Sequence, residues 1–202
     1  LQRLVDLEQS NARLEQEVDD SHYTLPPRHV EPVKKSSVLI LNDDMTSAGV
    51  GFFVSPKIVV TANHNLTSYR NATSINVKVF SNIGFVSANL TVKVRNTDLD
   101  LAVLTFAGTQ HSHLSIISDA SSVGEQRLAV TSFSIAISAE LSEIQFEGDG
   151  FALVPAQMFK ISSNHIVYQS NVFSGDSGGA VVFSKEGKVV ALHLETVNQA
   201  HE

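Results

Sequence analysis

The chain has 202 residues, of which 43% are hydrophobic and 17% are charged. This composition is sufficient for a folded core and excludes a wholly disordered chain. The net charge of −7 argues against a nucleic-acid partner, because a phosphate backbone attracts basic surfaces. The chain contains no cysteine, which excludes disulfides, thiol nucleophiles and cysteine metal sites. No apolar run is long enough for a transmembrane helix, so no membrane partner is expected.

The first 24 residues predict an acidic amphipathic helix. The segment contains neither Gly nor Pro, and its residues at heptad spacing are Leu4, Asn11 and Val18 in one series and Leu7 and Leu14 in the other. An apolar seam with one Asn at an a position is typical of a coiled coil. Two interpretations stay open. The helix is the end of a longer coiled coil that makes a homo-oligomer or binds a partner, or it lies on its own domain. Because the chain begins with Leu1, we expect a fragment of a longer protein.

A proline-rich segment follows over residues 25–32. It contains Pro26, Pro27 and Pro32, three of the five prolines of the chain. Proline removes a backbone donor and disfavours helix in the residue before it. We therefore expect the helix to end here and residues 25–32 to form a semi-rigid linker.

From Val33 onward the sequence changes to short β-rich runs separated by turn residues. The expected strands span 38–42, 50–54, 58–61, 75–80, 85–94 and 101–106 in a first group, and 127–133, 143–147, 158–162, 165–169, 180–183 and 189–195 in a second. Two groups of about six strands with no long helix between them predict a mainly β fold, either paired barrels or a sandwich.

The strongest local motif is Ser174–Gly179, with the sequence SGDSGG, directly before an apolar strand. A nucleophilic serine needs an exposed hydroxyl and backbone N–H groups that converge on the oxyanion, and small flexible neighbours allow both. The alternative is a plain glycine-rich hairpin loop. Ser177 is therefore a candidate nucleophile.

Two further residues have the chemistry that such a serine requires. His64 ends a strong apolar strand, where a rigidly held ring can act as a general base. On its own it would be an ordinary core or surface histidine. Asp98 and Asp100 precede the apolar run that begins at Leu101. An acid at the entrance to a buried strand needs a partner, and a histidine N–H is a suitable one.

The chain order His, Asp, Ser, with Thr-Ala-x-His, Asp-Leu-Ala-Val-Leu and Gly-Asp-Ser-Gly-Gly, resembles the chymotrypsin-type (trypsin-like) serine peptidases. The match covers roughly residues 36–196. The resemblance implies a peptidase domain over 33–202 made of two six-stranded antiparallel β-barrels, the first over about 33–110 and the second over about 120–202. Because the tail after Ser177 is short for this family, we expect the second barrel to be incomplete.

The resemblance also implies an activity and its residues. The chain would be a serine endopeptidase that forms an acyl-enzyme, with His64 as base, Asp100 as its orienter and Ser177 as nucleophile. The backbone N–H groups of Gly175 and Ser177 would form the oxyanion hole. Asp98 is the competing acid, but Asp100 directly precedes the Leu-Ala-Val-Leu run, as the aspartate of the family does.

The sequence departs from the secreted trypsins in two ways. Asn65 replaces the cysteine that follows their histidine, and all their disulfides are missing, so we expect a cytoplasmic or other reducing compartment. Secretion is the alternative, since sequons begin at Asn65, Asn71 and Asn89. A glycan on Asn65 would crowd His64, and we interpret the sequons as chance matches.

The secreted trypsins are activated when a new apolar terminus pairs with the aspartate before the serine. Asp176 occupies that position, but the nearest candidate terminus, Val33, is followed by two lysines. We therefore expect Asp176 to be satisfied within the chain without zymogen cleavage.

Three residues bear on substrate preference. His193 matches a histidine that reads acidic or amide side chains in glutamyl endopeptidases and in some viral cysteine peptidases of this fold. Asn171 stands where trypsins carry an aspartate, which argues against Arg or Lys selection. Glu195 would repel an anionic side chain or pair with His193. The two interpretations are a pocket that selects Glu or Gln before the scissile bond and an ordinary hydrogen-bonded strand histidine.

The expected substrate is a peptide or protein, bound as an added strand beside the pocket strand. No cofactor and no metal are expected, because His111 and His113 lack a third local ligand. The alternative function is a catalytically weak interaction module with a protease fold, dimerised by the helix over 1–24.

Overall fold

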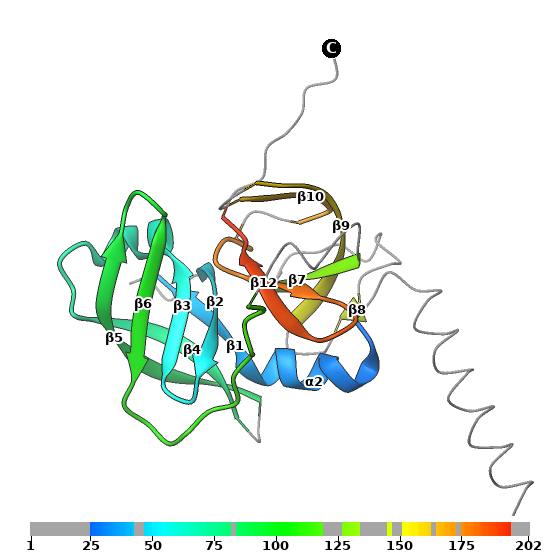
Figure 1. The fold of residues 1–202 in the computed structure, drawn as a ribbon. Coiled ribbons are helices and arrows are strands. Elements are labelled where there is room, and N and C mark those ends of the chain that lie inside the picture. Colours follow the sequence, from blue (N-terminus) through cyan, green and yellow to red (C-terminus); the bar gives the residue numbers. More distant parts are fainter. Residues whose placement is uncertain are drawn as a thin grey trace, which may run out of the picture.

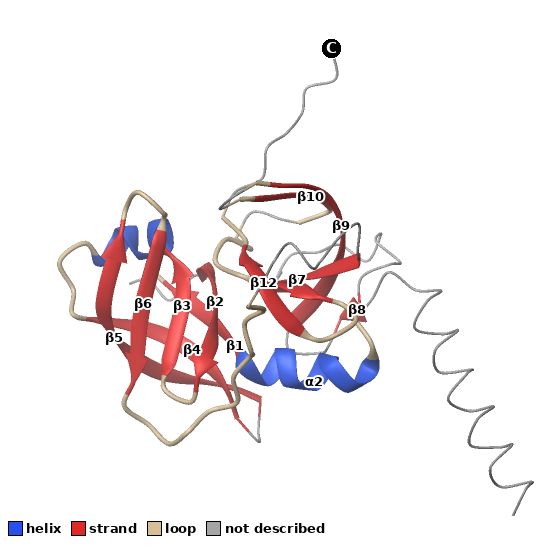
Figure 2. Ribbon diagram, in the orientation of Figure 1, coloured by secondary structure: helices blue, strands red, loops and turns tan. Residues whose placement is uncertain are grey.

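The computed structural model describes residues 25–42, 47–81, 84–118, 127–133, 145–146, 151–162, 165–172 and 175–194. The predicted helix over 1–24 and the predicted pocket residue Glu195 lie outside the described residues. Figures 1 and 2 show a mainly β protein with two bodies of antiparallel strands; the helix α2 (Pro27–Ser36) lies below the second body and leads into β1 of the first. None of the described helices is long and apolar enough to span a membrane.

The first body is a closed six-stranded barrel. Its strands are β1 (Ser37–Leu41), β2 (Ser47–Ser55), β3 (Ile58–Ala62), β4 (Ser74–Ser81), β5 (Gly84–Asn96) and β6 (Leu101–Phe106), in the order β1-β2-β3-β6-β5-β4. On β4 the buried residues Ile75, Val77 and Val79 alternate with more exposed ones, because successive side chains of a strand point to opposite faces. This alternation packs the barrel interior, and the predicted first barrel is confirmed.

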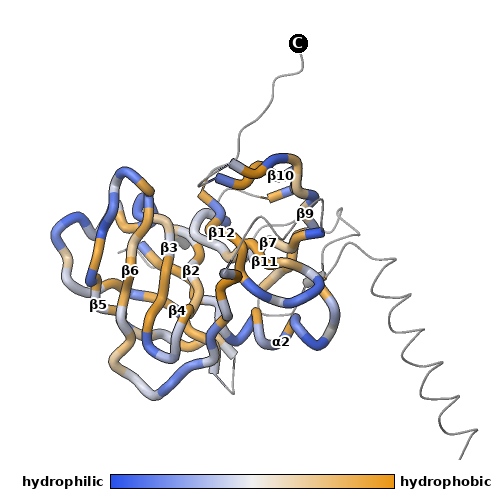
Figure 3. Tube along the Cα trace, viewed as in Figure 1, coloured by the Kyte–Doolittle hydropathy of each residue, from blue (hydrophilic) through white to orange (hydrophobic). Residues whose placement is uncertain are grey.

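The second body is a sheet that does not close within the described residues. Its strands are β7 (Arg127–Phe133), β8 (Gln145–Phe146), β9 (Phe151–Ile161), β10 (Ile166–Ser170), β11 (Ala180–Phe183) and β12 (Lys188–Leu192), in the order β10-β9-β7-β11-β12 with β8 beside β9. In Figure 3 hydrophobic residues follow the strands of both bodies, and hydrophilic residues gather in the turns. The architecture agrees with the predicted chymotrypsin-like fold.

Strand β9 is longer than the sequence predicts. The expected strand covered only 158–162. The strand instead begins at Phe151, and Pro155 lies opposite Ala129 of β7. Residues Phe151 to Val154 are buried on the sheet, and their burial outweighs the one N–H that proline lacks.

The segment over 25–32 differs from the predicted linker, because α2 begins within it. Pro26 is the N-cap, and Pro27 occupies the first turn. There a missing N–H has no helical partner to lose and the fixed φ of proline suits the helix. Pro32 lies inside α2 and removes one helical hydrogen bond, a loss that is offset by tertiary packing.

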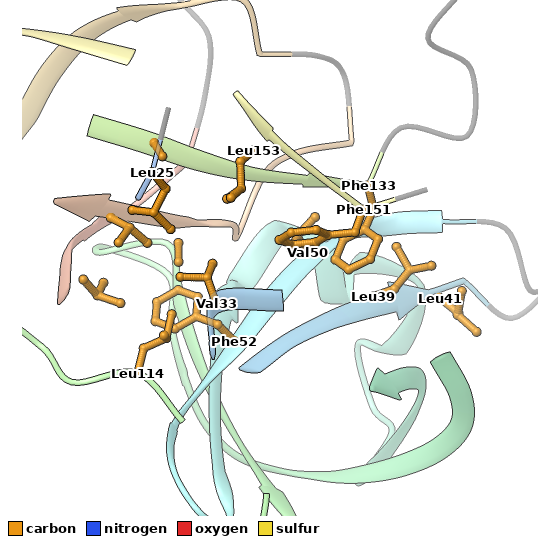
Figure 4. Packing of buried hydrophobic residues seen from close by; sticks show 14 residues of the cluster. Leu25, Val33, Leu39, Leu41, Val50, Phe52, Leu114, Phe133, Phe151 and Leu153 are labelled. Atoms are coloured by element: carbon orange, nitrogen blue, oxygen red, sulfur yellow. The ribbon is translucent and has the colours of Figure 1, made fainter. Parts of the chain in front are cut away.

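That packing forms a core between the two bodies (Figure 4). Leu25 and Val33 are almost fully buried in it. The labelled members from the rest of the chain are Leu39, Leu41, Val50 and Phe52 of the barrel, Phe133, Phe151 and Leu153 of the second sheet, and Leu114 from the connection between them. The shared core holds the barrel and the second sheet in one relative position, on which any site between them depends.

Candidate active site

His64 and Asp100 contact each other at one end of the barrel. His64 lies in the 3-10 helix η1 (Asn63–Tyr69) directly after β3, and Asp100 directly precedes β6. Because Ala62 pairs with Leu101 in the antiparallel register of these strands, the two residues are neighbours. Nδ1 of His64 lies 2.6 Å from Oδ2 of Asp100, and the backbone N–H of His64 donates to Oδ1 at 2.9 Å.

The backbone of Asp100 is held in an uncommon conformation. Its φ is 48°, in the left-handed region that Asp tolerates better than most residues. The N–H of Asn63 donates to the Asp100 carbonyl at 2.9 Å. The aspartate is thus tied to the histidine segment by its main chain as well as its carboxylate. Asp98, the competing acid, is exposed, and the carboxylate beside His64 is that of Asp100.

Ser177 lies in the loop that precedes β11. The loop turns through Gly175 at φ +100° and Gly178 at φ +86°, conformations that glycine adopts without strain. Between them Asp176 is only 1% exposed, and the Ser132 hydroxyl donates to its Oδ1 at 2.5 Å. The prediction that Asp176 finds a partner within the chain is confirmed. The independence from zymogen cleavage stays a prediction.

Contacts with the barrel place this loop next to the histidine segment. The carbonyl oxygen of Ser177 accepts the N–H of Val50 at 2.8 Å and the Asn65 side-chain amide at 2.7 Å. The Ser177 hydroxyl donates to the carbonyl of Leu194 at 2.9 Å. Among the described residues no hydrogen bond joins this hydroxyl to His64, although the backbone of Ser177 is bonded to the residue that follows the histidine.

His193, which follows β12, is buried beside the serine loop. The backbone N–H of His193 donates to the carbonyl oxygen of Gly179 at 2.9 Å, and the His193 carbonyl oxygen accepts the N–H of Gly178 at 2.6 Å. Nδ1 of His193 lies 2.5 Å from the hydroxyl of Tyr168 on β10. Burial lowers the pKa of His193, and the nearby His64 lowers it further. The ring is therefore neutral at neutral pH.

Burial also raises the pKa of Tyr168, and the charge of Asp176 raises it further. Tyr168 thus keeps its proton at all ordinary pH values. When it donates that proton to Nδ1 of His193, the other ring nitrogen, Nε2, carries the histidine proton. Asn171, the other described pocket residue of the prediction, is exposed just after β10.

Sequence reasoning missed the roles of three polar residues that hold this region together: Asn65, Ser132 and Tyr168. Ser132 and Tyr168 lie in β-rich runs with no local pattern that marks their partners. For Asn65 the sequence offered one signal of a role at the site, namely its position directly after His64. It is 4% exposed and its amide nitrogen donates inward, so a glycan at this sequon is incompatible with the fold.

His111, one of the two histidines considered for a metal site, contacts an aromatic ring and a backbone carbonyl. The ring of His111 stacks on Phe53 with centroids 4.3 Å apart, and its Nε2 lies 2.8 Å from the carbonyl of Phe80. His111 therefore packs against the barrel. The described part of the chain contains no group of three residues that could hold a metal ion.

Comparison with solved structures shows the same fold. The chain is similar to the crystal structure of Deg5, with a TM-score of 0.64, 17% identity and coverage of 84% of this chain and 83% of that one. It is also similar to the Rv3671c protease in an inactive form, with a TM-score of 0.59, 20% identity and coverage of 86% and 83%. A serine-to-alanine mutant of Rv3671c from M. tuberculosis H37Rv, also in an inactive form, gives a TM-score of 0.58, 19% identity and coverage of 84% of each chain.

No curated protein matches the sequence. A family model described as a trypsin-like peptidase domain matches residues 49–192, which is more than half of the chain and includes His64, Asp100 and Ser177. The chain therefore belongs to the trypsin-like peptidase family and is a serine peptidase.

Proposed function

We propose that the chain is an endopeptidase in which His64 is the general base, Asp100 orients it and Ser177 is the nucleophile. The observation that carries this proposal is the double contact of Asp100, whose carboxylate meets both Nδ1 and the backbone N–H of His64. A carboxylate in this position keeps the histidine proton on Nδ1 and leaves Nε2 free to accept the serine proton. It also stabilises the imidazolium that forms.

Substrate binding would free the serine for this transfer. In the resting arrangement the Ser177 hydroxyl donates to the Leu194 carbonyl. A peptide that adds as a strand beside this segment would offer its own N–H to that carbonyl. The displaced hydroxyl can then turn to His64, consistent with catalytic hydrogen bonds that form fully only in the substrate complex.

The reaction then follows two steps. Ser177 Oγ attacks the peptide carbonyl while His64 takes its proton, and the negative oxygen is met by the N–H groups of Gly175 and Ser177. Neither N–H donates to any acceptor in the described part of the chain, so both are available. His64 passes the proton to the leaving amine, which leaves an acyl-enzyme, and a water activated by His64 hydrolyses it.

Covalent labelling tests the nucleophile. A fluorophosphonate is expected to label the wild-type chain at one site and to leave Ser177→Ala unlabelled, because only an activated serine attacks phosphorus rapidly. Intact-mass measurement gives the stoichiometry, and peptide mapping gives the site. An unlabelled wild type, or equal labelling of Ser177→Ala, contradicts the proposal.

We further propose that the pocket selects Gln or Glu before the scissile bond through His193. The Tyr168 hydroxyl at Nδ1 supports an imidazole whose Nε2–H is a hydrogen-bond donor, which suits a side-chain oxygen of either residue. Because burial and His64 both lower the pKa of His193, this donor is neutral at neutral pH. A neutral donor without a counter-charge favours the Gln amide over the Glu carboxylate there.

The preference is expected to change with pH. Between about pH 8 and about pH 5 the ratio of kcat/KM for a Glu peptide to that for the matched Gln peptide should rise roughly tenfold. As the pH falls toward the lowered pKa of His193, a growing share of the ring is charged and attracts the carboxylate but not the amide. Taking the ratio cancels any pH dependence that the two substrates share. A ratio that stays constant with pH, or that changes equally in His193→Asn, contradicts the pocket assignment.

A further inference from the structure

We propose that Asn65 is a positioning residue that fixes the distance between the base and the nucleophile. It is the residue directly after His64, and its amide nitrogen donates to the carbonyl oxygen of Ser177 at 2.7 Å. One residue of η1 is thus proposed to supply the base, and the next one holds the backbone of the nucleophile. This inference rests on the roles proposed above for His64 and Ser177.

The hydrogen bonds around Asn65 determine which way its amide points. Nδ2 also donates to Thr61 Oγ1 at 3.0 Å and approaches the Val50 carbonyl at 3.4 Å. The Thr61 hydroxyl donates to that same carbonyl, so it can only accept from Asn65. Every group on this side is an acceptor, and a side-chain oxygen placed here would meet only other oxygens. The site therefore requires an N–H donor.

Two glycines leave the space that this arrangement needs. A Cβ on Gly49 would lie 2.2 Å from Asn65 Nδ2. A Cβ on Gly178 would lie 2.0 Å from the Val50 carbonyl oxygen and 2.7 Å from Asn65 Nδ2. All three distances are shorter than a normal van der Waals contact, so a side chain at either position would push the Asn65 amide or the Val50 backbone aside. The serine loop, β2 and the Asn65 amide can approach this closely only because both positions are glycine.

The consequence for catalysis comes from the peptide that Asn65 holds. The Ser177 carbonyl belongs to the peptide bond between Ser177 and Gly178, so its direction governs the orientation of the serine backbone and the hydroxyl attached to it. Val50 anchors the same oxygen from the barrel, but it belongs to β2 and not to η1. Asn65 is the link that joins the nucleophile to the segment of the base, and a misplacement of about 1 Å lowers a rate by about 10²-fold.

The test separates positioning from stability. In Asn65→Leu, which keeps the number and branching of the side-chain heavy atoms but removes the donor, the second-order rate of fluorophosphonate labelling and kcat should each fall about 10- to 100-fold, with KM nearly unchanged. In Gly49→Ala the amide is present but pushed aside, and the same loss is expected. Gly49 is not in the left-handed region, so alanine is tolerated by the backbone, and this variant keeps the test valid if Asn65→Leu does not fold.

The matched control is Ser37→Ala. It deletes another buried hydrogen bond from a side chain to a carbonyl, that of the Ser37 hydroxyl to Val33 at 2.9 Å, at the junction of α2 and β1. Labelling is measured per folded molecule, well below the melting temperature of each variant. Ser37→Ala should lower the melting temperature but not the labelling rate.

The outcomes are distinguishable. If the wild type is labelled and both site variants label within twofold of it, Asn65 has only a structural role and this inference is overturned while the proposed function stands. If the wild type itself is not labelled, both fail. Slow labelling in Asn65→Leu and Gly49→Ala together with wild-type labelling in Ser37→Ala supports the positioning role.

Discussion

Replacing His64 by Ala is expected to lower kcat for peptide hydrolysis by about 10⁶-fold, because in the proposed mechanism serine, base and orienter act as a unit and the loss of the base removes the benefit of the whole set. The residual rate should come from substrate binding and the oxyanion hole alone. Steady-state kinetics on the best peptide, with active-site concentration normalised by folded protein, measures the change.

His165→Ala is the matched control for this variant. His165 is exposed between β9 and β10, and its hydrogen bonds to Ser162 use its backbone carbonyl, which alanine retains. We expect its kcat to stay within about twofold of wild type. A loss below about 10²-fold in His64→Ala, or an equal loss in both variants, would show that His64 is not the base.

Asp100→Asn is expected to lower kcat by about 10⁴-fold with little change in stability. An Asn side chain fits the same space but can present an N–H to Nδ1 of His64. The ring then carries its proton on Nε2, the nitrogen that accepts the serine proton in the proposed mechanism. The side chain at position 100 would still contact Nδ1 of His64, as Asp100 does at 2.6 Å, but it would select the tautomer that cannot accept the serine proton.

Asp98→Asn provides the comparison, since it makes the same chemical change two residues away on an exposed side chain. Its kcat should remain close to wild type at every pH. Both variants should unfold at nearly the wild-type denaturant concentration. A large kinetic loss in Asp98→Asn, or none in Asp100→Asn, would reverse the assignment of the two acids.

The arrangement explains why a shared core matters for a site of this kind. His64 and Asp100 belong to the barrel, and Ser177 belongs to the second sheet, so no single element holds the three. The core that contains Leu25 and Val33 of α2 joins the two bodies, and Asn65 adds a polar link at the site itself. The apolar core sets the approximate position of the second sheet relative to the barrel. We infer that the hydrogen bond from Asn65 to Ser177 then fixes the nucleophile relative to the base.

Much of the fold could be predicted from local pattern. The bounds expected for 101–106, 127–133 and 180–183 agree with β6, β7 and β11 to the residue. Short apolar runs bounded by turn residues are a strong indication of a β-strand. The two largest differences are the helix that begins within 25–32 and the length of β9. In 25–32 the local rule against helix at prolines was overridden by burial, and β9 extends over the buried residues 151–154, which the prediction did not include. Local sequence does not report such burial.

The candidate residues His64, Asp100 and Ser177 could also be found from the sequence alone, since each sits in a short motif whose residue types carry its chemistry. Choosing between Asp98 and Asp100 already relied on resemblance, and the pairing of Ala62 with Leu101 supplies the geometric reason.

What the sequence determined by itself was the set of chemical groups and their order along the chain, because strand patterns and motifs extend over a few residues. Only the tertiary structure decided which groups meet. Asn65 reaches Ser177 across 112 residues, Asp176 finds Ser132 across 44, and His193 finds Tyr168 across 25. Such pairs depend on how two sheets pack around a common core, and no local pattern encodes that distance.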